Sequence, residues 1–256
     1  MVGATQLDGG PSFDWGTQCV LVTGAARRLG RALSRALAER GAAVALHYHR
    51  SRREAEELAQ QLNASGHRAW SIQADLARAE EQERLAREVL ERCERVTGLV
   101  NSASVYRPAP LERIGRPDWD EHLAVNLTAP AWLSIRLGRA MRASGGGAIV
   151  QVGDWSVSQP YPQYLPYTVS KGALEAATRA LARELAPEVR VNMVALGPIL
   201  LPEGSDPDYA QRVARAVPLG RVGHPAEFVR AVLFLLGEAT FTTGSVLTVD
   251  GGRGLA

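Results

Sequence analysis

Apolar residues occur along this chain as short continuous runs that alternate with longer stretches of helical periodicity. The runs predict strands at Gln18–Thr23, Ala42–Tyr48, Arg68–Gln73, Thr97–Asn101, Ala148–Val152, Arg190–Ala195 and Val246–Val249. The amphipathic stretches predict helices at Leu29–Arg40, Arg52–Ala64, Glu80–Arg95, Asp118–Ala143, Tyr167–Leu185 and Pro225–Leu236. Strands that are apolar at nearly every residue are typical of a parallel sheet covered by helices on both faces.

This alternation predicts an α/β fold, a single-domain Rossmann-type, doubly wound parallel sheet of about seven strands with helices on both faces. No linker or internal repeat divides the chain. We expect residues 1–16 to form a flexible N-terminal tail and residues 17–256 to form one domain. The alternation is interrupted at 197–220, a segment with proline and glycine whose length is typical of a functional lid.

Composition and charge narrow the classes of partner. The 29 basic and 27 acidic residues nearly cancel and form no basic stripe, which argues against a nucleic-acid partner. No apolar run reaches the ~18 residues of a membrane span, and the N-terminal stretch lacks the apolar segment of a signal peptide. These features predict a cytoplasmic protein without a membrane partner.

The cysteines and histidines do not suggest a metal site. Cys19 and Cys93 lie far apart and form no CxxC pair, so we expect two buried, reduced thiols. The histidines show no spacing of four residues on a helix, and we therefore expect no bound metal.

A glycine-containing turn connects the first predicted strand to the first helix. The strand runs directly into Thr23-Gly24-Ala25-Ala26-Arg27-Arg28-Leu29-Gly30. Glycines allow a tight turn and a close backbone approach to a pyrophosphate, and the following helix N-terminus offers unpaired N–H groups. Such a turn is a weak signal alone, but its position in the first strand–helix unit favours dinucleotide binding.

The end of the second predicted strand distinguishes between the two nicotinamide cofactors. An acidic residue there would bind the ribose 2′-hydroxyl of NAD, whereas this chain reads His47-Tyr48-His49-Arg50-Ser51. His49, Arg50 and Ser51 together offer charge and hydrogen bonds to a 2′-phosphate, which favours NADPH. The alternative is a solvated helix start that Ser51 simply caps. Asp75 has two interpretations, a contact to the adenine amine or a helix cap.

Tyr167 and Lys171 are four residues apart, on one face of a predicted helix. A phenol with a pKa near 10 is a poor acid or base at neutral pH, and a neighbouring ammonium lowers that pKa. The spacing alone is common on helix surfaces. After a dinucleotide-binding turn and a fifth strand, it indicates a proton-transferring pair.

From Gln18 to Gly252 the chain resembles the short-chain dehydrogenase/reductases. The resemblance rests on the Thr23–Gly30 turn, Asn101-Ser102-Ala103, Asn126, the Tyr167/Lys171 pair and Asp250-Gly251-Gly252. It implies that residues 17–256 are a catalytic domain, that the protein is a homotetramer, and that Gly251–Ala256 lies near subunit contacts.

The resemblance also implies roles for single residues. Tyr167 is the expected proton donor, Lys171 holds the nicotinamide ribose and lowers the pKa of the tyrosine, and Asn126 supports a water relay to Lys171. The implied cofactor-binding residues are Gly24, Arg28, Leu29, Gly30, His49, Arg50, Ser51, Asp75, Leu76, Asn101, Ser102, Ala103, Tyr167, Lys171 and Gly197.

Several positions depart from the common pattern of that family. Arg28 stands where a second glycine is usual, and Asp154 stands where a serine is usual, thirteen residues before Tyr167. Asn101-Ser102-Ala103 continues as Ser104-Val105-Tyr106, and the sixth strand is followed by Leu196-Gly197-Pro198 rather than Pro-Gly. The first three departures resemble the pteridine reductase and dihydromonapterin reductase branch.

Asp154 gives these departures a chemical meaning. An ionised carboxylate cannot donate to a ketone oxygen as a serine does, but it can bond Tyr167 and help move a proton to a ring nitrogen. By resemblance the substrate-binding residues are Arg28, Ser104, Tyr106, Asp154 and Tyr167, with Tyr106 stacking on the heterocycle. The alternatives are that Arg28 binds only the cofactor phosphate, that Tyr106 lines a generic pocket, and that Asp154 is a structural partner of Lys171. Trp155 is a further candidate for the pocket wall.

The hypothesis that follows is NADPH-dependent reduction of a pterin, of dihydropterin or dihydrofolate type, to its tetrahydro form. The first alternative is a carbonyl or 3-oxoacyl thioester reductase, which the aspartate at position 154 disfavours. The second is a non-catalytic NADPH-binding sensor, which would need neither Tyr167 nor Lys171.

Overall fold

A sheet of seven parallel strands forms the centre of the computed structural model, which describes residues 13–201 and 204–256. The strands lie in the order β3-β2-β1-β4-β5-β6-β7, and each neighbouring pair is parallel. Their bounds are β1 Cys19–Thr23, β2 Ala43–Tyr48, β3 Ala69–Gln73, β4 Gly98–Asn101, β5 Gly147–Asp154, β6 Val189–Leu196 and β7 Val246–Val249. The predicted fold class is confirmed.

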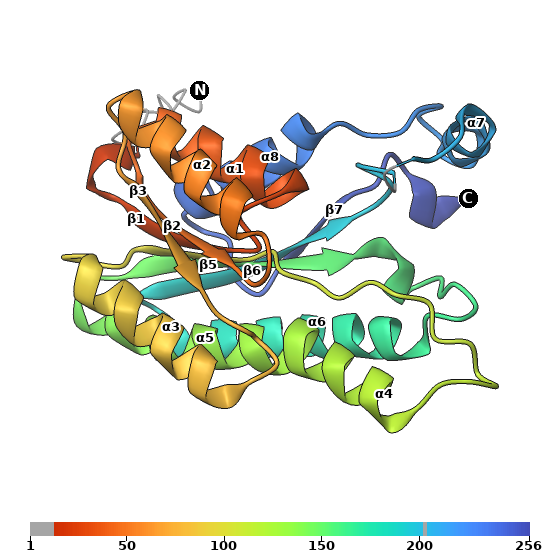
Figure 1. The fold of residues 1–256 in the computed structure, drawn as a ribbon, viewed down its shortest axis with the longest axis horizontal. Helices are drawn as coiled ribbons and strands as arrows, with labels where there is room; N and C mark the ends of the chain where they lie inside the picture. Colours follow the sequence, from red (N-terminus) through yellow and green to blue (C-terminus); the bar gives the residue numbers. More distant parts are fainter. Residues whose placement is uncertain (1–12, 202–203) are drawn as a thin grey trace, which may run out of the picture.

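Helices cover both faces of this sheet, which is why its central strands are apolar at nearly every position. The bounds of the α-helices are α1 Arg28–Glu39, α2 Arg52–Ala64, α3 Ala79–Arg92, α4 Arg116–Leu123, α5 Ala129–Ala143, α6 Leu165–Leu185, α7 Pro207–Arg215 and α8 Pro225–Leu233. Figure 1 shows α1, α2 and α8 on one face and α3, α5 and α6 on the other. Two apolar cores result, one around Leu33 and Phe228 and one around Leu85 and Leu133, all fully buried.

The order of the strands places a ligand crevice between β1 and β4. From β1 the chain adds β2 and β3 on one side, and it then adds β4 to β7 on the other side. Ligands of open α/β sheets bind where the order reverses, at the carboxyl ends of the strands. The register pairs Thr23 with Asn101 and Asp154 with Leu196, so the ends of these strands lie along one edge.

The predicted helix Asp118–Ala143 contains a turn of a different kind. A π-helical turn, Ala124–Thr128, separates α4 from α5. The prediction of one continuous α-helix is therefore wrong at this turn. A single inserted residue shifts the spacing of the apolar positions too little to reveal the turn in the sequence. Turns of this type are frequent at functional sites, and this one carries Asn126.

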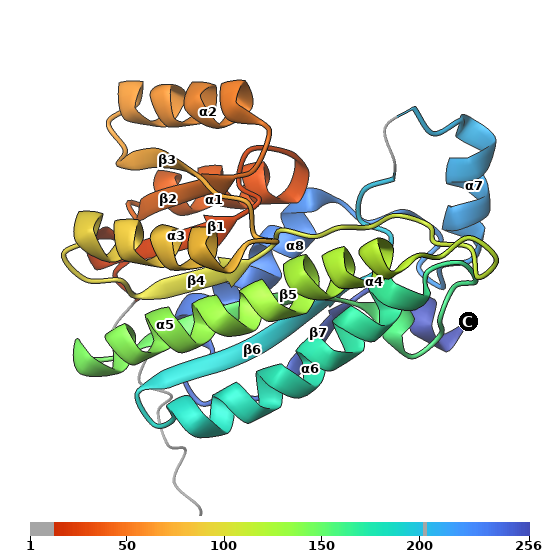
Figure 2. The same ribbon diagram turned by 60° about the horizontal axis from the view of Figure 1, so that its bottom comes forward.

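The predicted lid segment 197–220 contains helix α7, which the sequence prediction did not include. Asp206 caps this helix by accepting a hydrogen bond from the backbone N–H of Tyr209 at 2.6 Å, and Pro207 occupies its first position. Figures 1 and 2 both show α7 at the same end of the molecule as the C-terminus.

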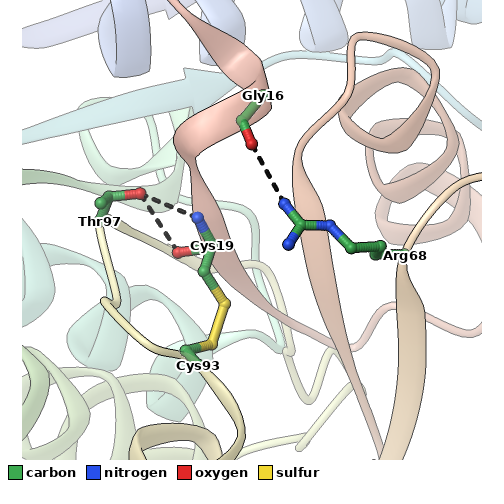
Figure 3. Close-up of a disulfide and its surroundings, with 5 residues drawn as sticks. All are labelled: Gly16, Cys19, Arg68, Cys93 and Thr97. Atoms are coloured by element: carbon green, nitrogen blue, oxygen red, sulfur yellow. Dashed lines mark hydrogen bonds between the residues drawn. A yellow bond between two sulfur atoms is a disulfide. The ribbon is translucent and has the colours of Figure 1, made fainter.

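The predicted tail 1–16 is only partly described, because residues 1–12 lie outside the described residues. Asp14 caps a short 3₁₀ turn, Trp15–Thr17, and Trp15 packs against the core beneath α1 and α8. Arg68 donates a hydrogen bond to the carbonyl of Gly16 at 3.1 Å (Figure 3). Residues 14–16 of the predicted tail therefore contact the domain, and residues 1–12 of that prediction lie outside the described residues.

Figure 3 shows a disulfide between Cys19, the first residue of β1, and Cys93, the residue after α3. The segment after Cys93 leads into β4, and β4 pairs with β1, which brings the two Cα atoms to 6.2 Å. Thr97 strengthens this junction, since its hydroxyl accepts a hydrogen bond from Cys19 N at 3.1 Å. The predicted burial of the cysteines is confirmed, but the prediction of two free thiols is wrong.

Candidate active site

A large cavity of about 940 Å³ opens at the carboxyl ends of β1, β4, β5 and β6. Its lining includes the turn after β1, the segment after β4, the end of β5, the start of α6 and the lid segment with α7. Three of the four predicted catalytic residues, Asp154, Tyr167 and Lys171, line it, and the fourth, Asn126, does not. Trp155, the further candidate for the pocket wall, is also among the lining residues.

The turn after β1 leaves no room for larger side chains at its two predicted glycines. Gly24 has a φ of +67°, and a Cβ there would meet the Cα of Ala103 at 3.0 Å. A Cβ on Gly30, in the first turn of α1, would lie 2.1 Å from the carbonyl oxygen of Gly24. The two glycines therefore let β1, α1 and the segment after β4 approach closely, which is the shape that a pyrophosphate cradle requires.

Arg28 begins helix α1 with a φ of +50°, in the left-handed region where glycine is favoured. This conformation explains why a glycine is common at this position in the family that the chain resembles. The Arg28 side chain crosses the cavity mouth and donates to the carbonyls of Leu200 and Leu201, both at 3.1 Å. Arg28 therefore links the cofactor turn to the lid segment.

His47 fixes this turn from behind, a role that sequence reasoning missed. The backbone N–H of Gly24 donates to its Nδ1 at 3.1 Å, so the proton is on Nε2, which lies 3.1 Å from the carbonyl of Ala74. Burial lowers the pKa of His47 to about 4, which keeps the ring neutral. The signal in the sequence was a histidine within an otherwise apolar buried strand.

The residues predicted to bind a 2′-phosphate gather at the ends of β2 and β3. Arg50 is exposed, and Ser51 is the N-cap residue of α2 without a side-chain capping bond. His49 Nε2 lies 3.8 Å from a carboxylate oxygen of Asp75. Asp75 Oδ1 accepts from Ala77 N at 3.0 Å, so this side chain stabilises a turn ahead of α3 rather than capping α3 itself.

The other residues predicted to contact the cofactor lie in the apolar cores, at a buried polar site or at the cavity. Leu29 is partly buried against the core beneath α1, whereas the Leu76 side chain lies fully in the opposite core. Asn101 is buried and donates to Gln151 Oε1 at 2.9 Å, away from the cavity lining. The backbone of Ser102 and Ala103 lines the cavity, and both N–H groups donate to the hydroxyl of Thr23 at 3.0 and 3.1 Å.

Asn126 in the π-helical turn binds the segment after β4 to helix α6. Its Oδ1 accepts from Val105 N at 2.8 Å and from the Ser104 hydroxyl at 3.2 Å. Its Nδ2 donates to Val105 O at 2.9 Å and to the Ser170 hydroxyl at 3.1 Å. None of these four bonds goes to Lys171, so this side chain acts as a clamp that positions Ser104 and Val105. The water relay implied by resemblance stays a prediction.

Asp154 and Tyr167 form the centre of the site. The tyrosine hydroxyl donates to Asp154 Oδ2 at 2.6 Å, and Asp154 Oδ1 accepts from Ser156 N at 2.8 Å. Each carboxylate oxygen thus has a fixed partner. Lys171 donates to the carbonyl of Val152 at 2.8 Å, and no ion pair of the described residues joins it to Asp154.

Burial is the largest cause of the pKa shifts of Tyr167 and Lys171. Burial and the Asp154 carboxylate raise the pKa of Tyr167 well above its usual value of 10.0. Burial lowers the pKa of Lys171 to about 8, and the Asp154 carboxylate opposes part of that shift. The expectation that Lys171 lowers the pKa of the tyrosine is therefore not met in this structure, because desolvation and a neighbouring carboxylate dominate. Tyr167 keeps its proton at neutral pH.

Aromatic rings line the cavity beside Tyr167. Tyr106 stacks on Tyr164 with ring centroids 4.6 Å apart and an angle of 13°, and it contacts Tyr167 edge-on at 4.7 Å. The Tyr106 side chain is half-exposed, with 52% of its surface accessible. A half-exposed aromatic ring therefore lies beside the ring of Tyr167.

Gly197, after β6, continues the pairing of β6 with β7. Its N–H donates to the carbonyl of Val249 at 3.0 Å, and a Cβ at this position would lie 2.5 Å from the Cα of Asp250. The departure Leu196-Gly197-Pro198 therefore keeps the lid segment close to the end of β7. Gly197 and Pro198 both line the cavity.

Residues 13–201 and 204–256 contain no group of three or more His, Cys, Asp or Glu side chains placed to hold a metal ion. In the same part of the chain, no helix has the length and apolarity needed to cross a membrane.

Comparisons with known proteins agree with this fold. A family described as Enoyl-(Acyl carrier protein) reductase matches residues 24–253. Carbonyl reductase family member 4 of Danio rerio is 36% identical over 238 residues, covering 92% of this chain and 98% of the relative. Granaticin polyketide synthase putative ketoacyl reductase 2 of Streptomyces violaceoruber is 34% identical over 242 residues, covering 92% and 95%. The chain belongs to the short-chain dehydrogenase/reductase family and is an oxidoreductase of that type.

Two solved structures are similar over nearly the whole chain. FolM alternative dihydrofolate reductase 1 from Brucella canis, complexed with NADP, has a TM-score of 0.89 and 37% identity, covering 95% of this chain and 96% of that one. The corresponding protein from Brucella suis, also in complex with NADP, has a TM-score of 0.88 and 37% identity, covering 94% and 96%.

Proposed function

We propose that this protein reduces a dihydropterin to its tetrahydro form with NADPH. The observation that carries the proposal is the 2.6 Å hydrogen bond from Tyr167 to Asp154, at the position where a ketone reductase of this family would carry a serine. An ionised carboxylate at that position offers no donor to a substrate oxygen. It does hold the hydroxyl of a protonated tyrosine inside the cavity.

The residues around the glycine turn fit a dinucleotide. Gly24 and Gly30 leave no room for a Cβ, the N-terminus of α1 follows, and Arg50 and Ser51 offer a cation and a hydroxyl beyond the end of β2. The similarity to two NADP complexes supports the choice of NADPH. The cofactor, when bound, supplies the hydride.

The remaining chemistry belongs to side chains of this protein. In a 7,8-dihydropterin the N5=C6 bond is reduced, so C6 takes the hydride and N5 takes a proton. Tyr167, neutral at pH 7, donates that proton, and Asp154 fixes the direction of its hydroxyl. The half-exposed ring of Tyr106 packs against the heterocycle. Ser104 and Arg28, at the walls of the cavity, face its polar edge.

A second candidate is a carbonyl or 3-oxoacyl thioester reductase. It is supported by similarity to relatives that are reductases of this kind by name, among them a 3-oxoacyl-[acyl-carrier-protein] reductase of Synechocystis that is 31% identical over 238 residues. The similarity to the FolM structures and the aspartate at position 154 favour the pterin over the thioester. A non-catalytic NADPH sensor is disfavoured by the buried Tyr167 and Lys171.

The test is NADPH oxidation at 340 nm with dihydrobiopterin, dihydrofolate and an acetoacetyl thioester in parallel. We expect turnover of at least one pterin and loss of that turnover in Tyr167→Phe, with the affinity for NADPH retained. Turnover of the thioester alone would overturn the pterin assignment. Tight NADPH binding without any turnover would favour the sensor.

We also propose a homotetramer located in the cytoplasm, with 17–256 as the catalytic domain. Light scattering on a size-exclusion column measures the oligomeric state, and a mass of four copies of the 27.5 kDa chain is expected.

The location in the cell is tested by fractionation, with the protein expected in the cytoplasmic fraction. Because a disulfide is uncommon in the cytoplasm, the redox state of Cys19 and Cys93 in cells is measured in the same fractions.

A further inference from the structure

Two arginines line the cavity beyond the catalytic pair, and neither is explained by the proposed chemistry. Arg212 lies on α7 in the lid segment, and Arg253 lies in the short 3₁₀ turn Arg253–Leu255 at the C-terminus. Both views of the fold place α7 and the C-terminus at the same end of the molecule (Figures 1 and 2). Their side chains therefore approach one cavity from two segments far apart in the sequence.

Aromatic rings hold both guanidinium groups. Arg253 lies over the ring of Trp155 at 4.8 Å, and Arg212 lies over the ring of Tyr209 at 5.8 Å. Trp155 in turn contacts Tyr161 edge-on at 5.6 Å. A guanidinium held by its face keeps its N–H donors directed outward in its plane, where they can bind a carboxylate in two parallel bonds.

Neither arginine has a carboxylate partner among the described residues. No ion pair among residues 13–201 and 204–256 includes Arg212 or Arg253. Asp250, the acidic residue closest in sequence to Arg253, instead uses its two oxygens to accept from Gly252 N and Gly254 N, both at 2.8 Å. These bonds fix the turn that presents Arg253.

The charge of the cavity lining also favours an anion. Among the described residues of that lining Asp154 is the single acidic one, against Arg27, Arg28, Lys171, Arg212 and Arg253. Asp154 is engaged with Tyr167 and Ser156, and Arg27 and Arg28 lie at the turn that fits the cofactor. Arg212 and Arg253 are thus the cations of the lining that lie outside both the glycine turn and the catalytic pair.

We propose that Arg212 and Arg253 form a subsite for the carboxylates of a long acidic side chain on the substrate. This inference rests on the proposed function and selects, among the pterins, the dihydrofolate type with its aminobenzoyl-glutamate tail. The substituent of a pterin is attached at C6, next to the nitrogen that receives the proton. It therefore leaves the heterocycle beside Tyr167 and Asp154, and the next residue along the chain is Trp155 beneath Arg253.

The test compares dihydrofolate with dihydrobiopterin, which has a short, uncharged side chain. We expect the double variant Arg212→Gln/Arg253→Gln to raise KM for dihydrofolate at least about tenfold, as loss of charge-assisted hydrogen bonds predicts. The effect on dihydrobiopterin is expected to be several times smaller. The dissociation constant of folate, measured by calorimetry without turnover, is expected to rise in parallel, and high salt is expected to reduce the difference.

Matched variants separate charge from folding and from the cofactor. Arg215→Gln removes the same charge from the same helix at an exposed residue outside the cavity lining, and we expect it to leave the ratio of the two KM values unchanged. Arg253→Lys keeps the charge and is expected to restore part of the dihydrofolate preference. Circular dichroism of each variant establishes that it is folded.

An equal rise of KM for both pterins in the double variant, or an effect confined to the affinity for NADPH, would overturn the proposed subsite. The proposed function would still stand. If the wild-type protein reduces neither pterin, the proposed function fails and the subsite fails with it. The two failures are therefore distinguishable in one set of measurements.

Discussion

Asp154 ends β5 with both of its carboxylate oxygens occupied, one by the Ser156 N–H and one by the Tyr167 hydroxyl. Because the backbone bond fixes the carboxylate, the carboxylate in turn fixes the direction of the phenol. The same carboxylate raises the pKa of Tyr167, so the tyrosine holds its proton until a more basic acceptor arrives. Tyr167 could be predicted from its spacing to Lys171, whereas its raised pKa depends on burial that no spacing reveals.

His47 shows the opposite case, since its importance is visible only in three dimensions. Its ring joins the cofactor turn after β1 to the end of β3. We expect His47→Leu to weaken NADPH binding about tenfold, because Gly24 N and Ala74 O lose a partner at a cost of ~1–3 kcal/mol each. His47→Gln keeps a donor and an acceptor and is expected to restore part of the affinity. Fluorescence titration with NADPH measures both, and wild-type affinity in the leucine variant would exclude this positioning role.

His47 also predicts how stability depends on pH. Its pKa is about 4 in the folded protein and 6.5 in the unfolded chain, so between these values the unfolded chain binds a proton that the folded protein does not. The free energy of unfolding is therefore expected to fall by up to about 1.4 kcal/mol per pH unit as pH decreases from 6.5 to about 4. Urea unfolding across this range, compared with His47→Gln, isolates this contribution.

The elements that carry the site differ in how far their sequences predict them. Apolar runs give the positions of the strands in the described sheet to within two residues. In β1, β2, β4, β5 and β6 the reason is that burial on both faces leaves few polar residues, whereas the edge strands β3 and β7 are only partly buried. The π-helical turn at Asn126 and helix α7 were missed. The π-helical turn was missed because it changes the helical period at one residue only. Helix α7 was missed because it is short and has no buried residue.

The disulfide was missed for a related reason, since a pairing across 74 residues depends on the β1–β4 neighbourhood. We expect its reduction, or Cys93→Ser, to lower the free energy of unfolding by about 2–4 kcal/mol. The chain has two cysteines, so thiol titration of the unreduced, denatured protein is expected to find none free. Two free thiols per chain would contradict the bond, and Cys93→Ser, with one thiol, serves as the reductant-insensitive control.

At the scale of the whole molecule, the strand order gathers residues from 24 to 253 around one cavity. The predicted site residues Gly24, Tyr106, Asp154 and Tyr167 do meet there, because the carboxyl ends of parallel strands share one edge. The sequence could not place Arg212 and Arg253 beside them. Their positions depend on the path of the lid segment and of the C-terminal turn, which carry no periodic pattern.

The central claim is that Asp154, acting through Tyr167, selects a pterin nitrogen rather than a ketone oxygen. Asp154→Ser tests it most directly, measured as kcat/KM for dihydrobiopterin and for an acetoacetyl thioester at 340 nm. We expect kcat/KM for the pterin to fall about a hundredfold in the variant, or roughly 2.7 kcal/mol of transition-state stabilisation. We expect kcat/KM for the thioester to stay the same or rise. An unchanged ratio of the two values, or a wild-type preference for the thioester, would contradict the claim.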